Sequence, residues 1–387
     1  MRSSIAQGME DEMAHAERIL IVGGGIGGLS VAAALHASGF APELIERSDA
    51  WRAVGAGIAM QPNGMRVLRT LGLGTAVERA GTAIRYWDFC DEQGDILAET
   101  DLTALWSDVG PFVGIARREL QRALLAATAA IPSRLGTSVK SLTQDDGGVW
   151  VELTDGSAAT YDLVIGADGV GSSVRQLAFD AAPPVYGEQM VWRSVAPVRP
   201  RGLTNLQFLL GDGCFFGLCP VGSDQTYGFG NVAGPLVRDP PEGRLDRLRE
   251  RFAGFGDIVH EYLGALDSAA EIHCSAIEWL GEEHWCTGRV VLIGDAAHAS
   301  SPMMGQGGAL AIEDAGVLAE SLRAADSVEE ALDAFVVRRR PRVRWVREQS
   351  RIAGESLRMP VTARNALLRV RGDEMMRQRF APLLEAP

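Results

Sequence analysis

The sequence predicts an α/β fold in which a Rossmann-like domain carries an inserted β-sheet domain and a helical C-terminal segment. The first observation is an apolar run at 18–22 that stops at glycines and is followed by a helical stretch and a second strand, as in a βαβ unit. The second is that two later apolar runs, 161–165 and 289–293, also end at glycines. The third is a change, between about 183 and 277, to short aromatic-rich strands separated by Gly and Pro turns.

Composition limits the class of protein. The chain has 387 residues, of which 47% are hydrophobic and 22% charged, so it has length for about two domains and is too apolar to be disordered. A formal net charge of −13 argues against nucleic acid or an anionic membrane as the main partner. Five cysteines without a C-x-x-C pair indicate neither a disulfide framework nor a zinc knuckle, and favour a reducing compartment.

An apolar stretch at 19–35 has nearly the length of a signal-peptide core. Acidic residues precede it, at Glu10, Asp11, Glu12 and Glu17, where an export signal carries positive charge. It is also too short and too glycine-rich for a membrane-spanning helix of about 20 residues. We therefore expect a soluble, cytoplasmic protein, either a monomer or a homodimer.

The elements can be placed in order along the chain. Helical patterns occupy 117–130, 309–324 and 328–350, and one or two helices fall near 245–263. The predicted organisation is a flexible arm at 1–17, a discontinuous nucleotide-binding domain at 18–80, 107–182 and 278–325, a β-rich substrate domain at 81–106 and 183–277, and a C-terminal helical segment at 326–387.

The glycines after the first strand form G-x-G-x-x-G, with Gly23, Gly25 and Gly28 at the fixed positions. Gly23 permits the turn, Gly25 lets a pyrophosphate approach the backbone, and Gly28 lets helix and strand pack closely. The helix N-terminus then presents free N–H groups to phosphates. Glu46 ends the second strand, where its carboxylate can accept hydrogen bonds from a ribose. Together these features predict dinucleotide binding.

Two further motifs follow in order. Residues 162–175 read D-L-V-I-G-A-D-G-V-G-S-S-V-R, and residues 294–307 contain a G-D pair followed by P-x-x-G-Q-G. With the first glycine motif, these segments resemble the single-component FAD-dependent aromatic hydroxylases, the p-hydroxybenzoate-hydroxylase-like flavoprotein monooxygenases. The resemblance covers about 18–350 and implies a GR2-type FAD-binding domain.

The resemblance implies a role for each matching residue. Glu46 and Arg47 would hold the adenosine end of FAD, Val139 would meet the adenine through its backbone, and Asp295 would bind the ribityl chain. Asp168 would organise the pyrophosphate region, although a turn role before Gly169 is the alternative. The expected residues for tightly bound FAD are Gly23, Gly25, Gly27, Gly28, Glu46, Arg47, Gly57, Arg117, Val139, Asp168, Asp295, Gly305, Gln306, Gly307 and Gly308.

The glycine-rich helix start at 305–308 has a physical reason of its own. Reduced flavin carries negative charge at its pyrimidine end, and a helix N-terminus stabilises such charge. The sequence holds no second complete G-x-G-x-x-G, so NADH or NADPH is expected to visit transiently as electron donor. The implied reaction is NAD(P)H- and O₂-dependent hydroxylation through a flavin C4a-hydroperoxide. Epoxidation, Baeyer–Villiger oxidation and a non-catalytic flavin-binding protein are the alternatives.

The substrate side is less specified. Pro302 is expected against the flavin, where its carbonyl can meet a substrate hydroxyl, and His298 is either a general base or a packing residue. Arg193 is the nearest candidate to anchor an anionic substrate. No cation lies within 211–220, so an apolar phenol or polycyclic substrate is favoured. At least two of a set of five aromatic residues are expected to line the pocket, and only one of the adjacent pair Phe215 and Phe216, because successive strand residues point to opposite faces. The five candidates are Trp192, Phe208, Phe215, Phe216 and Tyr227.

Two other clusters carry simpler interpretations. His273, Cys274, His284 and Cys286 match no common zinc spacing, so no metal site is expected. The run 338–351 contains seven Arg and one Glu, and a solvated helix pairing with carboxylates is favoured over a nucleic-acid or membrane face. The expected partners are therefore a small aromatic substrate and O₂.

Overall fold

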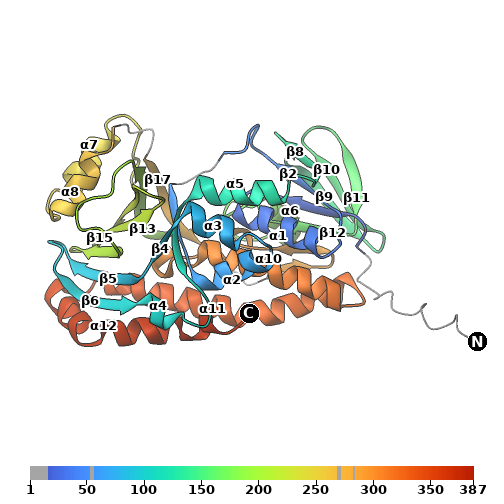
Figure 1. Ribbon diagram of the computed structural model, residues 1–387. Coiled ribbons are helices and arrows are strands. Elements are labelled where there is room, and N and C mark those ends of the chain that lie inside the picture. The colour runs from blue at the N-terminus through green and yellow to red at the C-terminus, as the bar shows by residue number, and fades with distance from the viewer. Residues whose placement is uncertain (1–15, 53–55, 268–271, 282–283) are drawn as a thin grey trace, which may run out of the picture.

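The computed structural model describes residues 16–52, 56–267, 272–281 and 284–387, so nearly all of the predicted N-terminal arm lies outside the described part. Figure 1 shows two sheet regions bridged by long helices. One region is built on a six-stranded sheet whose strands run in the order β18–β19–β12–β1–β2–β8. Their bounds are β1 Ile19–Val22, β2 Pro42–Glu46, β8 Ser133–Leu135, β12 Leu163–Gly166, β18 Cys286–Thr287 and β19 Val290–Leu292.

The centre of this sheet is parallel, as the βαβ interpretation requires. β1 pairs with β2 on one side and with β12 on the other, and β12 pairs with β19. All four β1 residues are buried, because helices cover one face of the sheet and other elements the opposite face. The predicted α/β class is confirmed.

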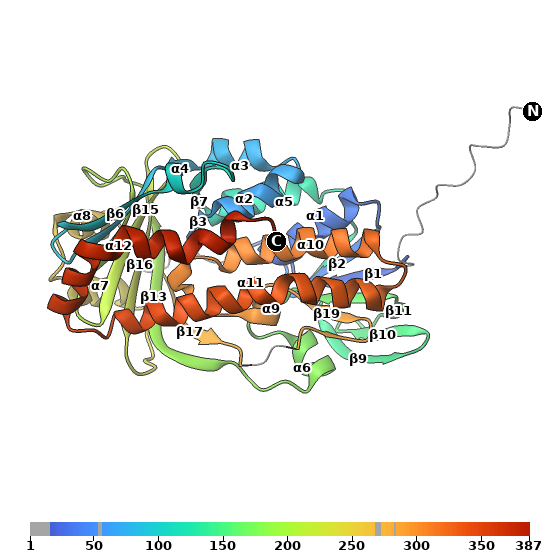
Figure 2. The same ribbon diagram turned by 90° about the horizontal axis from the view of Figure 1, so that it is seen from below.

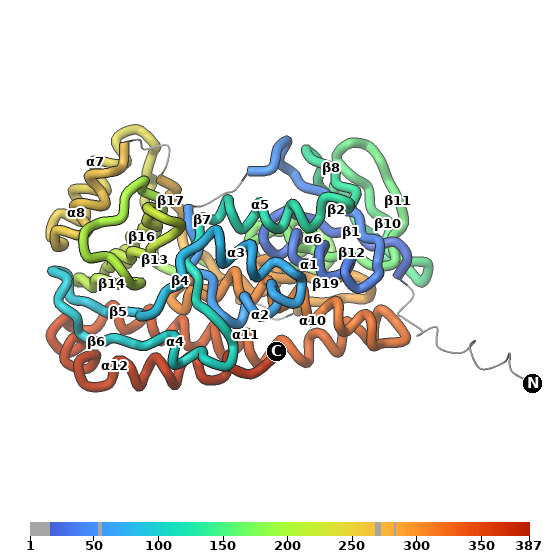
Figure 3. The backbone as a smooth tube through the Cα atoms, viewed as in Figure 1, coloured from blue at the N-terminus to red at the C-terminus, as the bar shows by residue number. Residues whose placement is uncertain are grey.

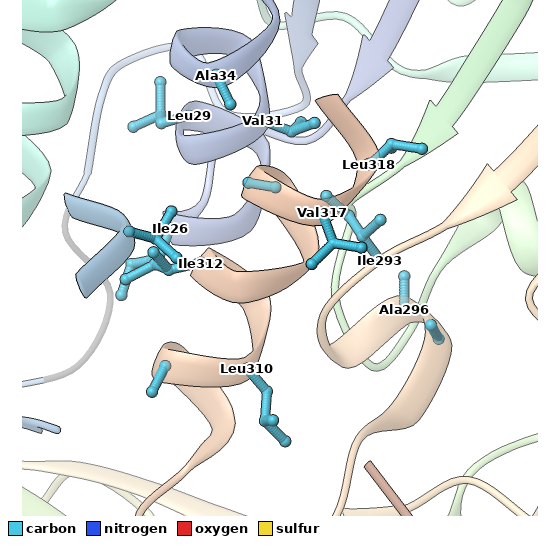
Figure 4. Close-up of a cluster of buried hydrophobic side chains, with 14 of the residues drawn as sticks. Ile26, Leu29, Val31, Ala34, Ile293, Ala296, Leu310, Ile312, Val317 and Leu318 are labelled. Atoms are coloured by element: carbon cyan, nitrogen blue, oxygen red, sulfur yellow. The ribbon is translucent and has the colours of Figure 1, made fainter. Parts of the chain in front are cut away.

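Helices α1 (Ile26–Ala37) and α10 (Gly307–Ala324) pack against each other in the core. Figure 4 shows their apolar side chains facing one another, with Ile26 of α1 beside Ile312 of α10. Close approach depends on small residues: a Cβ on Gly27 would lie 3.5 Å from Ala311 Cβ. At Gly28 a Cβ would lie 1.8 Å from the carbonyl oxygen of Gly23, so helix and strand could not meet there with any side chain.

Smaller elements surround this core. The bounds are β3 Gly57–Met60, β4 Thr82–Ile84, β7 Phe112–Ala116, α2 Pro62–Thr70, α3 Gly74–Ala80, α4 Leu102–Leu105, α5 Arg117–Ala127 and α6 Ser173–Phe179. A separate antiparallel sheet contains β9 Val139–Asp145, β10 Gly148–Leu153 and β11 Ala158–Tyr161. Strand β7 pairs with both β3 and β4, and this small sheet lies between the two larger regions (Figure 3).

The second region is a seven-stranded sheet in the order β17–β13–β16–β15–β14–β5–β6. Its strands are β5 Tyr86–Asp91, β6 Ile96–Asp101, β13 Val185–Ala196, β14 Leu206–Leu210, β15 Cys214–Val221, β16 Gln225–Ala233 and β17 His273–Trp279. The outer face is covered by α7 (Arg244–Arg251) and α8 (Asp257–Gly264), whose apolar side chains pack with residues of the sheet. The inner face joins the main core.

Two long helices, α11 (Val328–Ser356) and α12 (Val361–Leu384), run along one side of both regions (Figure 2). α12 packs on β5 and β6, where the Phe380 ring lies 5.9 Å from the Trp87 ring. The buried Arg364 donates hydrogen bonds from α12 to the carbonyls of Leu210 and Gly211. In the described part of the chain, no helix has both the length and the apolar character needed to cross a membrane.

The predicted solvated arginine helix is only partly right. Arg338 is exposed, but the next residue, Arg339, is 0% exposed. Its guanidinium lies 2.8 Å from Glu313 Oε2 and 2.7 Å from Asp314 Oδ1, and both carboxylates are also fully buried. Side-chain pairing with carboxylates therefore occurs on the exposed side of α11, at Arg338 and Arg351, and also inside the core, where α11 meets α10.

Arg339→Met is expected to destabilise the protein by about 3–5 kcal/mol, because it removes the fully buried cation that Glu313 and Asp314 share and leaves them Arg342 and His298 as ion-pair partners. Arg338→Met is the matched control on the same helix. Its partner Glu320 is exposed, so that loss is expected to stay below about 1 kcal/mol. Urea unfolding of the two variants measures the difference, and equal effects would contradict the role given to the buried network.

Candidate active site

A groove of about 270 Å³ opens where β1, β2, α5 and the loop before α6 converge. It lies at the carboxyl ends of parallel strands, where open α/β sheets bind ligands. The groove is lined by six of the predicted residues: Gly23, Gly25, Glu46, Arg47, Arg117 and Asp168. The other lining residues are Val22, Gly24, Ile26, Ile45, Ser48, Ala50, Trp51, Arg52, Gln121, Thr137, Ser138, Ala167, Gly169, Gly171 and Ser173.

The glycine turn is shaped for a ligand that approaches the backbone. Gly23 has φ of +109°, a conformation that L side chains rarely adopt. Around Gly25 no atom lies within 4 Å of the position of a Cβ. No side chain caps the N-terminus of α1, so its first-turn N–H groups face the groove without an internal partner. These amides and the helix dipole favour an anion such as a pyrophosphate.

Glu46 closes the other side of the turn. Its Oε2 accepts a hydrogen bond from the Gly24 N–H at 2.7 Å, and its Oε1 accepts one from the Ser48 N–H at 2.9 Å. The carboxylate is thereby fixed at the end of β2. The Trp51 ring covers Gly24, where a Cβ would lie 2.4 Å from it. The sequence interpretation missed Trp51, because nothing in its local pattern indicates which way the ring turns.

Asp168 has the predicted turn role and also lines the groove. The carboxylate accepts hydrogen bonds from the hydroxyl groups of Ser172 and Ser173, and from the backbone N–H groups of Ser173 and Val174. It therefore stabilises the first turn of α6, as expected for an acidic residue at a helix N-terminus. It also lines the groove, so the turn role and contact with a ligand are compatible.

Arg117 connects the groove with the seven-stranded sheet. Burial lowers the pKa of its guanidinium, the Asp295 carboxylate opposes that shift, and Arg193 adds to it. Asp295 starts the short helix α9 (Asp295–His298) and is exposed. Within the described residues nothing hydrogen-bonds to its carboxylate. It is thus open to a ligand between the two regions.

Among the predicted cofactor residues, Val139 and Gly57 lie at the margins. Val139 is buried at the start of β9, directly after the groove residues Thr137 and Ser138. Gly57 lies in β3 beneath Tyr227, whose ring atoms would meet a Cβ at 2.4 Å. Tyr227 thereby brings the seven-stranded sheet into contact with the cofactor-binding region.

The loop before α10 is held by amide side chains. It contains the 3₁₀ turn η2 (Pro302–Met304) and Gly305, which has φ of +64°. Gln61 Nε2 donates to the Met304 carbonyl at 2.6 Å, and Gln306 hydrogen-bonds to both Gln61 and Asn63. The Pro302 carbonyl accepts the Gly305 N–H at 2.8 Å, which leaves one of its lone pairs for another donor.

His298 lies in the same buried network. It is 3% exposed, and its Nε2 is 2.7 Å from Asp314 Oδ2, which also accepts the Gly294 N–H at 2.9 Å. His298 and Arg339 hold the pKa of Asp314 far below its usual range, against the effect of burial. These contacts favour the structural alternative for His298 over that of a general base. They also fix the turn that presents Asp295.

The inner face of the seven-stranded sheet is aromatic. Phe208 stacks on Phe215 with ring centroids 5.2 Å apart and lies edge-on to Phe229 at the same distance. The Tyr227 ring is 5.0 Å from that of Phe229. Phe208, Phe215 and Tyr227 therefore share one layer that faces the cofactor region, and Phe229 belongs with them.

Trp192 and Phe216 do not belong to this layer, which corrects the predicted pocket. Phe216 packs on Phe252 with ring centroids 4.9 Å apart, beneath α7 and α8. Trp192 donates from Nε1 to Asp239 at 2.8 Å, and its ring lies under the guanidinium of Arg251. Successive strand residues point to opposite faces, so both side chains are turned outward.

Arg193 does lie on the inner face. It hydrogen-bonds to Ser275 at 3.3 Å and to the Tyr227 hydroxyl, and it is also close to His273. Burial raises the pKa of Tyr227, which keeps the phenol protonated at neutral pH, whereas Arg193 acts in the opposite direction. Burial and the nearby Arg193 lower the pKa of His273. The inner face thus has a polar end beside an aromatic layer.

Comparison with known proteins places the chain in a family. The profile of the FAD binding domain family matches residues 17–350. The chain belongs to the FAD-dependent aromatic hydroxylases. Aurachin C monooxygenase/isomerase of Stigmatella aurantiaca is 36% identical over 325 residues, which cover 83% of each chain. FAD-dependent urate hydroxylase of Klebsiella pneumoniae is 32% identical, with 84% of this chain and 87% of the relative covered.

Solved structures agree with this assignment. The crystal structure of HpxO from Klebsiella pneumoniae complexed with FAD and uric acid has a TM-score of 0.88 and is 28% identical, and the match covers 96% of this chain and 97% of that chain. The family resemblance, FAD as cofactor and the class of FAD-dependent monooxygenase are confirmed. The groove of this flavoprotein fits FAD, since it combines uncapped α1 amides, an open Gly25 and a fixed carboxylate at Glu46.

Asp295→Ala is expected to lower FAD affinity about ten- to a hundredfold, the value of a charge-assisted hydrogen bond, without changing the melting temperature of the apoprotein. Fluorescence titration of apoprotein with FAD measures the affinity. Asp168→Ala is the comparison variant, because its carboxylate also stabilises α6 and the melting temperature is expected to fall as well. Unchanged FAD affinity in Asp295→Ala would remove this residue from the site.

Proposed function

We propose that this flavoprotein uses NADH or NADPH and O₂ to hydroxylate a small aromatic molecule held between the cofactor and the inner face of the seven-stranded sheet. The observation that carries the proposal is the aromatic layer of Phe208, Phe215, Phe229 and Tyr227, which reaches the cofactor region at Gly57. A layer of rings favours a flat apolar substrate through burial and stacking.

The chain's own residues would hold FAD along its whole length. Glu46 and Arg47 would bind the adenosine end, the α1 amides would meet the pyrophosphate, and Asp295 and Arg117 would contact the ribityl chain. The start of α10 would meet the pyrimidine end of the ring system, where its dipole stabilises negative charge. Bound FAD supplies the redox chemistry, namely acceptance of a hydride and activation of O₂.

A transient nicotinamide site fits this arrangement, because the first glycine motif already serves FAD and no second motif of the kind exists in the sequence. The five cysteines are all free thiols, which is consistent with a reducing compartment, and we place the reaction in the cytoplasm.

The polar end of the inner face would orient the substrate. The Tyr227 phenol remains a hydrogen-bond donor at neutral pH, and Arg193 beside it carries a fixed positive charge. Together they would bind a substrate oxygen and stabilise negative charge on it. The names of two relatives point to molecules with one or two rings, urate as the compound hydroxylated and 2-heptyl-3-hydroxy-4(1H)-quinolone as the compound made, and we propose an aromatic substrate of similar size.

Phe215→Ala tests the aromatic layer. Loss of the contact between this ring and the substrate removes about 1.5–3 kcal/mol of binding free energy from apolar burial. The apparent KM should therefore rise about ten- to a hundredfold. Water also gains access to the reduced cofactor and O₂, so a larger share of NAD(P)H should yield hydrogen peroxide. The measurement is substrate-stimulated NAD(P)H oxidation together with peroxide and product.

Phe216→Ala is the matched control, since the neighbouring ring faces α7 and α8. It should lower the melting temperature and leave the peroxide share unchanged. If both variants behave alike, the layer does not line the substrate site. If neither variant changes the share of NAD(P)H that yields peroxide, while Arg193→Ala abolishes substrate binding, the site recognises an anion and not an apolar ring.

A further inference from the structure

A buried amide interrupts the aromatic layer. Asn231 in β16 is 0% exposed. Its Nδ2 donates to Gln189 Oε1 over a long distance of 3.4 Å, and its Oδ1 has no hydrogen-bond partner among the described residues. Native structures pair nearly all buried polar atoms, so an open acceptor inside a sheet calls for an explanation.

Strand alternation shows which way the amide points. Tyr227 and Phe229 belong to the inner face, and Asn231 follows in the same parity of β16. Phe215 is its direct neighbour across the β15–β16 pair. On β13, Gln189 has the parity of Arg193, which is also on the inner face. The amide pair therefore faces the cofactor side and not α7 or α8.

The amide pair also lies beside the turn that precedes α10. A Cβ on Gly354 of α11 would lie 3.3 Å from Gln189 Nε2 and 3.8 Å from Met303 Cγ. Met303 belongs to η2, whose Pro302 is expected at the flavin ring. The two amides thus stand close to the place where the substrate ring is expected.

The polar groups lie at two ends of the aromatic layer. Phe229 pairs with Arg193 across β13 and β16, and Asn231 lies two residues further along β16 on the same face. A flat substrate against Phe229 would therefore have Arg193 toward one end and Asn231 toward the other.

We propose that Asn231 Oδ1 is the substrate's hydrogen-bond acceptor, and that the substrate is a neutral one- or two-ring aromatic with a ring N–H or phenolic O–H at this end and an oxygen toward Arg193. Asn231 is thus a specificity-determining residue. The inference rests on the proposed function, since it assumes that the inner face holds the substrate. A site built to receive a donor discriminates against the analogue that lacks it, because the buried oxygen then stays unpaired.

The test uses two ligand pairs that differ in one donor: 4(1H)-quinolone against 1-methyl-4-quinolone, and 4-hydroxybenzaldehyde against 4-methoxybenzaldehyde. Each is titrated into oxidised holoenzyme, and the change in flavin absorbance gives Kd without turnover. The wild type should bind at least one donor-bearing ligand about tenfold or more tightly than its methylated analogue. Asn231→Leu, in which the new side chain is similar in size, should bring that ratio close to one by weakening the binding of the donor-bearing ligand.

Thr226→Val is the matched control. Thr226 is another fully buried residue of β16, and its hydroxyl has no partner in the described part of the chain, but it has the opposite parity and faces away from the cofactor side. The ratio of the two Kd values in Thr226→Val should equal that of the wild type. A wild-type ratio near one for both pairs, or an unchanged ratio in Asn231→Leu with full FAD content, overturns the proposal. So does failure of the wild type to bind either pair.

NAD(P)H oxidation measured on the same samples separates this inference from the proposed function. Aromatic-stimulated oxidation with a ratio near one would leave the function standing and reject the role of Asn231. A high ratio that depends on Asn231, without any NAD(P)H oxidation, would support the binding site and reject the hydroxylase reaction. The comparison of the ligand pairs in the wild type needs no variant, so it can still reject the proposal if Asn231→Leu does not fold.

Discussion

The ion network between α10 and α11 is the constraint on which the active site depends. Arg339 joins Glu313 and Asp314 inside the core, and each carboxylate then reaches a different loop at the cofactor. Asp314 holds the turn at Gly294, and Glu313 accepts a hydrogen bond from Asn63, which in turn binds Gln306. Both loops are therefore set by one helix.

This arrangement explains why the two halves of the site stay in register although they come from distant parts of the chain. α1 packs against α10 through Gly27 and Ala311, so α10 also positions the glycine turn that precedes α1. Burial of charges has a desolvation cost, which is offset only when every partner is in place. The network thus favours one geometry of the loops, as required of a site that must hold a cofactor precisely.

The parts of the site that follow from local rules were predictable from the sequence. The turn at Gly23, the close approach at Gly28 and the carboxylate at Glu46 depend on neighbours within one βαβ unit. The sequence could not show which aromatic side chains of the strands point inward. Alternating polarity identifies the two faces of a strand only when one face is exposed to solvent, and here α7 and α8 cover the outer face with apolar side chains. Trp192 and Phe216 were therefore indistinguishable from Phe215 in the sequence. Arg339 and Asp314 meet only after α11 folds onto α10, so their pairing could not be read from spacing.

The central claim is that this chain transfers an oxygen atom from O₂ to an aromatic ring. Product mass after turnover under oxygen-18 gas tests that claim most directly, with any aromatic compound that stimulates NAD(P)H oxidation. The product should carry one oxygen-18 atom. Consumption of NAD(P)H and labelled O₂ with formation of hydrogen peroxide alone, and no labelled product from any such compound, would contradict it.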